Sequence, residues 1–203
     1  MSPQVRLMTM IADMQARLSR AIKRSIACVT ARRFIRQQDG AAAVEFAMVA
    51  APFLAMVFAI LETAMVFFAG QALETAGSDS ARLIMTGQAQ TQNFDQAKFK
   101  GAVCDRIYGL FNCAGGLYVD VKNYSSFSAI NTGKPLDAAG NLQTGTFGYQ
   151  PGGPCNIVVV RLMYQWPVYV SLLGLNLADS AGNKRLLMST VAFRNEPYLG
   201  SCP

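Results

Sequence analysis

The sequence predicts a membrane-anchored α+β protein, in which a long N-terminal transmembrane helix continues into a small domain with a second helix and an antiparallel sheet. Three observations favour this fold class. Residues 47–61 carry no charge, apolar residues recur at helical spacing over 94–111, and apolar and polar residues alternate over 117–122. With 203 residues, 52% of them hydrophobic and 15% charged, the chain is too apolar for disorder and long enough for one modest domain plus a special segment.

The net charge of +6 is concentrated at the N-terminus. Residues 1–40 hold eight of the 18 Lys and Arg residues and two of the 12 acidic residues, so the remainder of the chain is neutral. A neutral body lacks the broad basic face that phosphate binding requires, and we expect no nucleic acid among the partners. We therefore interpret residues 1–40 as a basic cytoplasmic leader.

The leader carries apolar residues at three- and four-residue steps, with cations between them. This pattern is typical of an amphipathic helix that lies on the anionic membrane lipid of the inner leaflet. A partly disordered leader that only carries topogenic charge is the alternative, and both stay open. The apolar positions are Leu7, Ile11, Met14, Leu18, Ile22, Ile26 and Val29.

The apolar run after the leader has the length of a membrane span. At 1.5 Å per residue, a helix over 41–61 covers roughly 31 Å, close to the ~30 Å hydrocarbon thickness. We expect a transmembrane helix over about 43–68, in which Pro52 is tolerated. Because Lys and Arg stay on the cytoplasmic side, the N-terminus should lie inside and the domain outside. A buried helix of a soluble protein is the alternative.

Glu45 stands near the start of this span. An acidic side chain at membrane depth disfavours insertion by roughly 2.5–3.5 kcal/mol, so it needs a partner of opposite charge. The simpler interpretation places Glu45 at the inner headgroup boundary, where water satisfies it.

The residues around Glu45 resemble a known processing signal. The run GAAAVEFA at 40–47 follows the basic leader and resembles a type IV prepilin signal, in particular that of Flp-type pilins and TadE-like pseudopilins. Pro52, Glu62 and the run QAL at 71–73 follow in the order of the TadE-like segment, and Ala81 with Arg82 is similar to its closing pattern. Ser78-Asp79-Ser80 departs from the Gly-Ala-Arg run of many relatives. The TadE-like segment therefore covers 41–90 together with Gly40.

This resemblance implies a bacterial inner-membrane protein with a pilin-like fold. It implies cleavage between Gly40 and Ala41 by a prepilin peptidase of the membrane aspartyl type. Glu45 would then face the new amine of Ala41, within its own chain or on a neighbouring subunit, and Phe46 and Glu62 join it as assembly residues. The implied partners are this peptidase, the major pilin and other minor pilins, and the inner-membrane assembly platform. For Glu62, simple contact with water is the alternative.

Residues 91–203 predict a periplasmic α+β domain. We expect a helix over 94–111, and strands over 117–122, 156–164 and 185–194, with a turn at 181–184 before the last. Gly77 is a possible break in the long helix, and Pro167 predicts a bend or an edge position for its strand. The intervening loop, 123–154, is unusually long. Its aromatic residues form a binding surface or fasten the loop to the body; they are Tyr124, Phe127, Phe147 and Tyr149.

Of five cysteines, Cys28 lies in the leader and the other four lie in the outer domain. An even set in an oxidising compartment predicts two disulfides, and three pairings are possible. We favour Cys104 with Cys113, which closes the end of a helix, and Cys155 with Cys202, which ties the tail to a loop. A zinc site is the alternative, although the spacing contains no paired CxxC motif.

The predicted function is that of a TadE-like component of tight-adherence (Flp) pilus assembly, without a cofactor and without enzymatic chemistry. The chain contains no histidine, which excludes the commonest hydrolytic sites. One alternative is an unprocessed single-pass signal-anchor protein with a periplasmic binding domain. Another is a periplasmic enzyme, for which Asp105, Asp120 and Asp137 offer acids but no paired motif.

Overall fold

The structure is a computed structural model that describes residues 39–107, 109, 111–169, 174, 176–198, 200 and 202. The interpretations of the leader, including Cys28, lie outside the described residues. The chain divides into two compact units, residues 1–54 and 55–203, and each is considered by itself.

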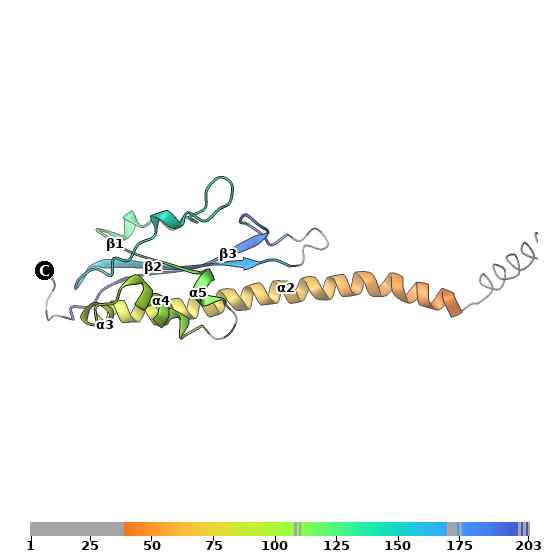
Figure 1. The fold of residues 1–203 in the computed structure, drawn as a ribbon, viewed down its shortest axis with the longest axis horizontal. Coiled ribbons are helices and arrows are strands. Elements are labelled where there is room, and N and C mark those ends of the chain that lie inside the picture. The colour runs from red at the N-terminus through yellow and green to blue at the C-terminus, as the bar shows by residue number, and fades with distance from the viewer. Residues whose placement is uncertain are drawn as a thin grey trace, which may run out of the picture. The chain divides into compact units, whose positions relative to one another are not determined.

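Helix α2 (Asp39–Met85) is the longest element, with 47 residues (Figure 1). Pro52 lies inside it and has no N–H for the carbonyl of the preceding turn, yet the helix continues. Gly77 does not break the helix either. A Cβ at that position would lie 2.5 Å from Ser189 Oγ, so glycine allows the close approach of α2 to the sheet. The helix ends before Gly87, which adopts a positive φ of 76°.

Three antiparallel strands form the sheet in the order β1-β2-β3. They are β1 (Leu117–Tyr124), β2 (Ile157–Pro167) and β3 (Lys184–Arg194). This confirms the predicted α+β fold with its antiparallel sheet. The edge position considered for the Pro167 strand is wrong for the strand as a whole, because β2 lies between β1 and β3. The pairing with β1 ends at Tyr164, however, so Pro167, the last residue of β2, lies opposite Lys184 of β3 with no β1 residue on its other side.

The second predicted helix is shorter than expected. Helix α4 (Gln96–Cys104) begins after Asp95, whose carboxylate accepts the N–H of Lys98 at 2.7 Å, so the expected start at residue 94 is wrong. The helix ends at Cys104, not at residue 111, and Gly109 beyond it has a positive φ of 65°. The apolar spacing over 94–111 reflects burial on one side of the chain, because Ile107 is buried without being helical.

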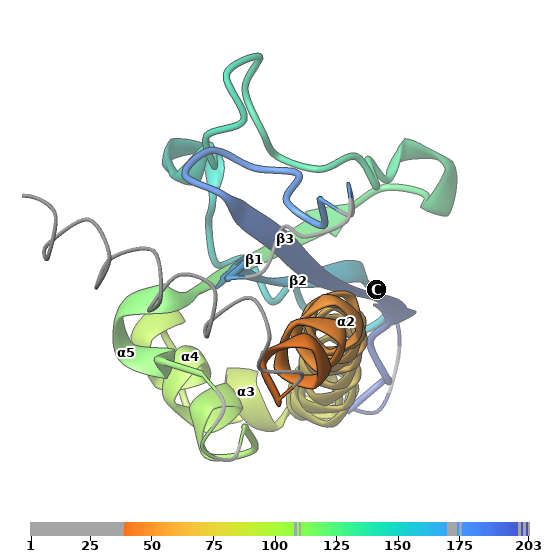
Figure 2. The ribbon, with the colours of Figure 1, turned by 90° about the vertical axis from the view of Figure 1, so that its right-hand side faces the viewer.

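The core of the 55–203 unit lies between the sheet and three helices (Figure 2). Figure 2 shows the C-terminal part of α2, α3 (Gln88–Thr91) and α4 on one face of the sheet, and the β1–β2 connection on the other. Alternate strand residues face the helices, as the pleat requires. They include Val119, Val121, Val158, Val160, Leu162 and Leu187, which join Val66, Ala69, Leu73, Ala76, Ala81, Ile84, Phe99 and Val103 from the helices.

The long β1–β2 connection is fastened to this body by part of its aromatic set. Tyr149 packs against Phe99 with ring centroids 5.6 Å apart, and Phe147 packs against Tyr118 at 6.2 Å. Residue 149 also forms a parallel bridge with Val121 at the outer edge of β1. The loop therefore has structure of its own, including the short 3-10 helices η1 (Phe127–Ala129) and η2 (Thr144–Thr146).

Candidate functional site

The candidate site is the exposed apolar surface of α2. The helix described over Gly40–Met85 is long and apolar enough to cross a membrane, and none of its most apolar window is buried by the part of the chain that the structure describes. Thirteen large apolar side chains of α2 are between 45% and 74% exposed. They are Val44, Phe46, Met48, Val49, Phe53 and Leu54 in the first unit, and Met56, Phe58, Ile60, Leu61, Met65, Phe67 and Phe68 in the second.

The predicted cleavage residues and two of the three predicted assembly residues, Glu45 and Phe46, lie in the first two turns of α2. Gly40, Ala41 and Glu45 are exposed, and Phe46 is 74% exposed. A Cβ built at Gly40 meets no atom within 4 Å, so packing in the described chain does not require glycine there. Glu45 follows Ala41 by four residues, which places both on the same face of the helix, about 6 Å apart along its axis.

Glu62, the third predicted assembly residue, has a partner within its own chain. Its carboxylate accepts the backbone N–H of Tyr169 at 3.2 Å, and Glu62 is only partly exposed. This bond ties the segment after β2 to α2. The sequence did not reveal it, since the two residues are 107 positions apart.

The cysteines lie in the two expected pairs. Cys104 and Cys113 have Cα atoms 5.7 Å apart, and Cys155 and Cys202 have Cα atoms 5.5 Å apart, both within the usual disulfide range. The first disulfide joins the end of α4 to α5 (Cys113–Gly116). The second joins the β1–β2 connection to the tail.

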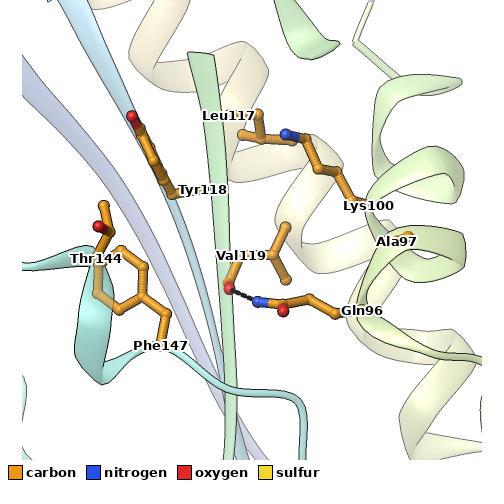
Figure 3. A pocket seen from close by; sticks show the side chains of 8 residues that line it. All are labelled: Gln96, Ala97, Lys100, Leu117, Tyr118, Val119, Thr144 and Phe147. Atoms are coloured by element: carbon orange, nitrogen blue, oxygen red, sulfur yellow. Dashed lines mark hydrogen bonds between the residues drawn. The ribbon is translucent and has the colours of Figure 1, made fainter. Parts of the chain in front are cut away.

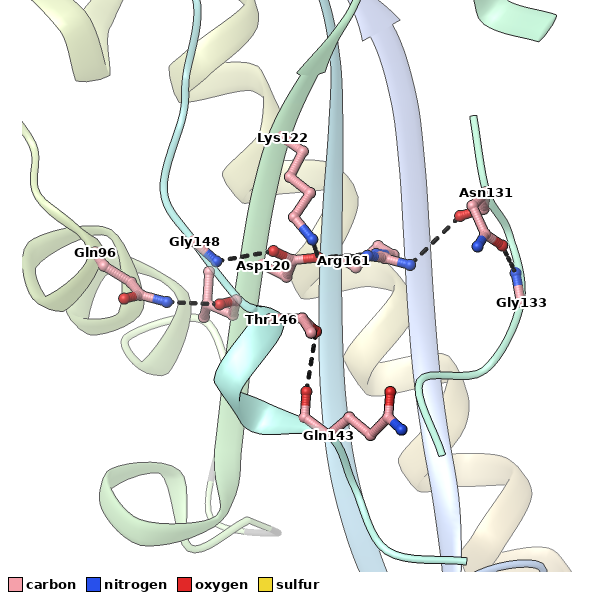
Figure 4. Close-up of polar contacts among 10 residues, drawn as sticks. Gln96, Asp120, Lys122, Asn131, Gly133, Gln143, Thr146, Gly148 and Arg161 are labelled. Carbon is pink, nitrogen blue, oxygen red and sulfur yellow. Dashed lines mark hydrogen bonds and ion pairs between the residues drawn. The ribbon is translucent and has the colours of Figure 1, made fainter. Parts of the chain in front are cut away.

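A buried ion pair on the sheet was missed by sequence reasoning (Figure 4). Asp120 of β1 contacts Arg161 of β2, accepting from Nε at 3.1 Å, and also accepts the N–H of Gly148 at 2.9 Å. Lys122 Nζ lies 3.5 Å away, and Arg161 Nη1 donates to Asn131 O at 3.4 Å. An Arg within the apolar run of 157–164 was the available signal, because a buried cation needs a carboxylate. The pair fastens the loop over the second face of the sheet.

A cavity of about 330 Å³ lies beside the edge of β1 (Figure 3). Figure 3 shows Gln96 and Lys100 of α4 on one side, and Tyr118 and Phe147 on the other. Gln96 Nε2 donates to Val119 O at 2.8 Å, so a side chain occupies the hydrogen-bonding edge of the strand.

Tyr149 is half-buried beside Phe99 of α4. Burial raises the pKa of Tyr149 to about 12, with a smaller contribution from the negative charge of Asp95. Within the described residues, the Tyr149 hydroxyl has no hydrogen-bond partner.

The three acids considered for catalysis lie in separate places. Asp105 follows the end of α4, Asp120 pairs with Arg161, and Asp137 accepts backbone N–H groups of its own loop. Hydrogen bonds from Asn141, the largest contribution, hold the pKa of Asp137 below its usual value. In the described part of the chain, no group of three His, Cys, Asp or Glu residues is placed to bind a metal ion.

Comparison with known proteins finds one similarity, and it lies in the long helix α2. A family model described as TadE-like protein matches residues 40–82. No curated protein and no solved structure matches the chain. The family suggests a Tad pilus-associated, pilin-like component that is structural rather than catalytic and that interacts with other pilins. The matched segment starts at Gly40 and ends within α2, so the part of the chain that carries the exposed apolar surface is the part that is similar to this family.

Proposed function

We propose that this protein is a pseudopilin-like component of tight-adherence (Flp) pilus assembly. A prepilin peptidase cleaves it between Gly40 and Ala41, and it then acts by packing α2 against the helices of other pilins. The domain over 91–203 lies in the periplasm and α2 anchors it in the inner membrane. The exposed apolar surface of α2 carries this proposal, because water disfavours thirteen uncovered large side chains on one helix.

Gly40 supports the cleavage step. Nothing in the described chain occupies the space of a side chain at residue 40, so contacts within the described fold do not require glycine there. A requirement outside the folded chain accounts for glycine at this position. A peptidase that accepts only a small residue before the scissile bond supplies such a requirement.

Cleavage gives Glu45 a counterion. The new N-terminus at Ala41 carries a positive amine, and Glu45 lies one helical turn away. In a low dielectric the attraction between amine and carboxylate is strong, although desolvation opposes it. Between subunits, the same contact fixes the axial offset of two packed helices, and we assign Glu45 this intermolecular role.

Small residues on α2 allow close approach of neighbouring helices. Ala47 and Ala51 are exposed, and Ala50 and Ala55 are partly exposed. Small side chains at such positions let helix backbones approach in a membrane. Ala59 is 8% exposed, so its own chain already covers it.

N-terminal sequencing of the membrane-extracted protein tests the proposal. We expect the mature chain to begin at Ala41, and Gly40→Leu to leave a full-length precursor. Gly70→Leu is the matched control, since a Cβ there also meets no atom within 4 Å, and this variant should be cleaved normally. Normal cleavage of Gly40→Leu would contradict the proposed site, and a wild-type chain that keeps its leader would favour the unprocessed signal-anchor protein.

A further inference from the structure

A groove of about 290 Å³ lies between α2 and β3, within the 55–203 unit. Thr63, Val66, Phe67 and Gly70 line it from α2, and Arg185 and Leu187 line it from β3. We propose that this groove binds one anionic phospholipid, with part of an acyl chain between α2 and β3 and the phosphate at Arg185. The proposal rests on the membrane span of the proposed function and adds a lipid site to it.

The apolar side of the groove suits an acyl chain. Phe67 is 72% exposed, and Leu177 and Leu186 extend the apolar lining from the opposite side. Gly70 leaves its wall open, because no atom lies within 4 Å of the place of a Cβ. A chain segment in the groove covers the exposed Phe67 ring and so removes apolar protein surface from water.

Arg185 supplies a cation for the phosphate. Its Nη1 donates to Leu177 O at 3.0 Å, which holds the partly buried guanidinium in place and leaves other N–H donors available. Among the described residues, Arg185 forms no ion pair with a carboxylate within 4.0 Å. The nearby Asp179 is committed to Lys134 and to the backbone N–H of Leu186. Glu74, at the far end of the groove, is exposed.

The groove lies at the level expected for lipid headgroups. The uncharged run ends at residue 61 and the expected span ends at about residue 68, so the outer boundary of the hydrocarbon falls between these two positions. This interval of the helix is about 10 Å long at 1.5 Å per residue, and it contains Thr63 and Phe67. The apolar lining from Thr63 to Phe67 therefore lies where the hydrocarbon meets the headgroup layer.

Two neighbouring residues fit the same level. Tyr169 is 78% exposed, and its N–H is bound to Glu62 at the end of the span. Tyrosine is enriched where hydrocarbon meets water, since its ring is apolar and its hydroxyl is polar. Lys184, next to Arg185, adds a second cation at this end of β3.

The size of the groove favours a lipid over a helix from another pilin. A helix with its side chains is about 10–12 Å across, whereas ordinary small-molecule pockets hold about 300–1,000 Å³. A groove of about 290 Å³ takes one segment of a chain. The charge of Arg185 then selects an anionic headgroup such as phosphatidylglycerol.

Lipid retention by the full-length protein tests this inference. The protein is reconstituted in nanodiscs of equal parts phosphatidylcholine and phosphatidylglycerol, and native mass spectrometry records the phospholipid that stays bound after release. We expect the wild type to retain phosphatidylglycerol preferentially, and Arg185→Gln to lose the preference roughly tenfold, the effect of one charge-assisted hydrogen bond. Arg194→Gln is the matched control. It removes the same charge from the other end of β3, where Arg194 Nε also donates to a carbonyl, that of Cys155, at 2.9 Å.

The single tryptophan gives a second measurement on the same samples. Trp166 lies opposite Arg185 in the β2–β3 register. Phosphatidylglycerol brominated near the glycerol end of its acyl chain should quench Trp166 in the wild type and in Arg194→Gln, and less in Arg185→Gln. An unchanged emission maximum of Trp166 in nanodiscs without brominated lipid shows that each variant remains folded.

The outcomes separate the lipid site from the proposed function. Equal phospholipid retention and equal Trp166 quenching in Arg185→Gln and Arg194→Gln would overturn the lipid site. If the wild type and both variants also resist carbonate extraction, the membrane span is still supported. A third outcome is a wild type that retains no phospholipid, while its Leu186→Cys variant cross-links to a helix of a second pilin. That pair of results would overturn the lipid site and assign the groove to that helix. Release of the wild type by carbonate would overturn the span and the lipid site together.

Discussion

The two halves of α2 place similar apolar residues in opposite environments. From Val44 to Phe68 most large apolar side chains are exposed, with Val57 partly exposed and Val66 buried, whereas beyond Phe68 none is exposed, and Leu73 and Ile84 are fully buried. Leu61 is 54% exposed, and Leu73, twelve positions later on the same helix, is 1% exposed. The same residue type therefore contributes to the stability of the domain in one half only.

The difference shows what each half requires. Between Glu45 and Glu62 the helix is apolar around its whole circumference, which suits a surrounding lipid phase or other helices. The C-terminal half mixes apolar residues with Gln71, Glu74 and Asp79, which are exposed, so it needs a core on one side only. Its own sheet supplies that core, whereas the described residues leave most of the half before Phe68 without such a cover.

Replacing one leucine in each half of α2 is the most sensitive test of this difference in burial. Leu73→Ala leaves a cavity between α2 and the sheet, and we expect it to lower the free energy of unfolding by about 2–5 kcal/mol. Leu61→Ala makes the same chemical change at an exposed helical position, so its effect should stay within about 0.5 kcal/mol. Urea unfolding of the full-length protein in mild detergent, followed by the fluorescence of Trp166 in the core, measures both. Similar losses for the two variants would contradict the assignment of Leu61 to an outward surface.

Two glycines of α2 test the same difference between covered and uncovered positions, with smaller expected changes in stability. A Cβ at Gly77 would lie 2.5 Å from Ser189 Oγ and 3.3 Å from Ser189 Cβ, whereas a Cβ at Gly70 meets nothing within 4 Å. Gly77→Ala should lower the free energy of unfolding by about 1 kcal/mol, because overpacking exceeds the gain in helix propensity. Gly70→Ala should raise it by up to about 1 kcal/mol, since only the gain applies.

A second substitution should rescue the stability that Gly77→Ala loses. The Ser189 hydroxyl is buried, and within the described residues it has no hydrogen-bond partner. Removing it in the double variant Gly77→Ala/Ser189→Ala should therefore restore stability to at least the wild-type value. If the double variant is no more stable than Gly77→Ala, the close approach at Ser189 is not the cause of the loss.

The parts of the fold that depend on local pattern were predictable from the sequence. Alternation over 117–122 identified β1, because strand pleating has a period of two residues. The short apolar run within 156–164 identified β2, because a strand buried on both faces is continuously apolar. The membrane-length apolar run identified the N-terminal half of α2, because its length as a helix matches the thickness of the hydrocarbon core. The end of α4 was not predictable, since apolar spacing continues to Ile107 after the helix has ended at Cys104.

Features that depend on distant partners were out of reach. Asp120 and Arg161 are 41 positions apart, and only the register of β1 with β2 places them together. Glu62 likewise found a partner in Tyr169 that no local spacing indicates. Of the predicted site, Gly40 and Glu45 came from a contiguous motif. Their proposed partners lie in other molecules, so cleavage and assembly stay predictions.

The smallest expected effect on folding concerns Glu45, where assembly is the sensitive measurement. Glu45→Gln should leave the free energy of unfolding unchanged within about 0.5 kcal/mol, because the residue is exposed in the first unit. The same change should lower the yield of sheared filaments roughly tenfold, through loss of the charge that pairs with the amine of Ala41. A neutral glutamine inserts into the membrane at least as easily as glutamate, so poor insertion does not account for such a loss. Glu74→Gln, an exposed position in the covered half of the same helix, should assemble normally. Wild-type filament yield from Glu45→Gln would instead favour water at the inner headgroup boundary as the partner of this carboxylate.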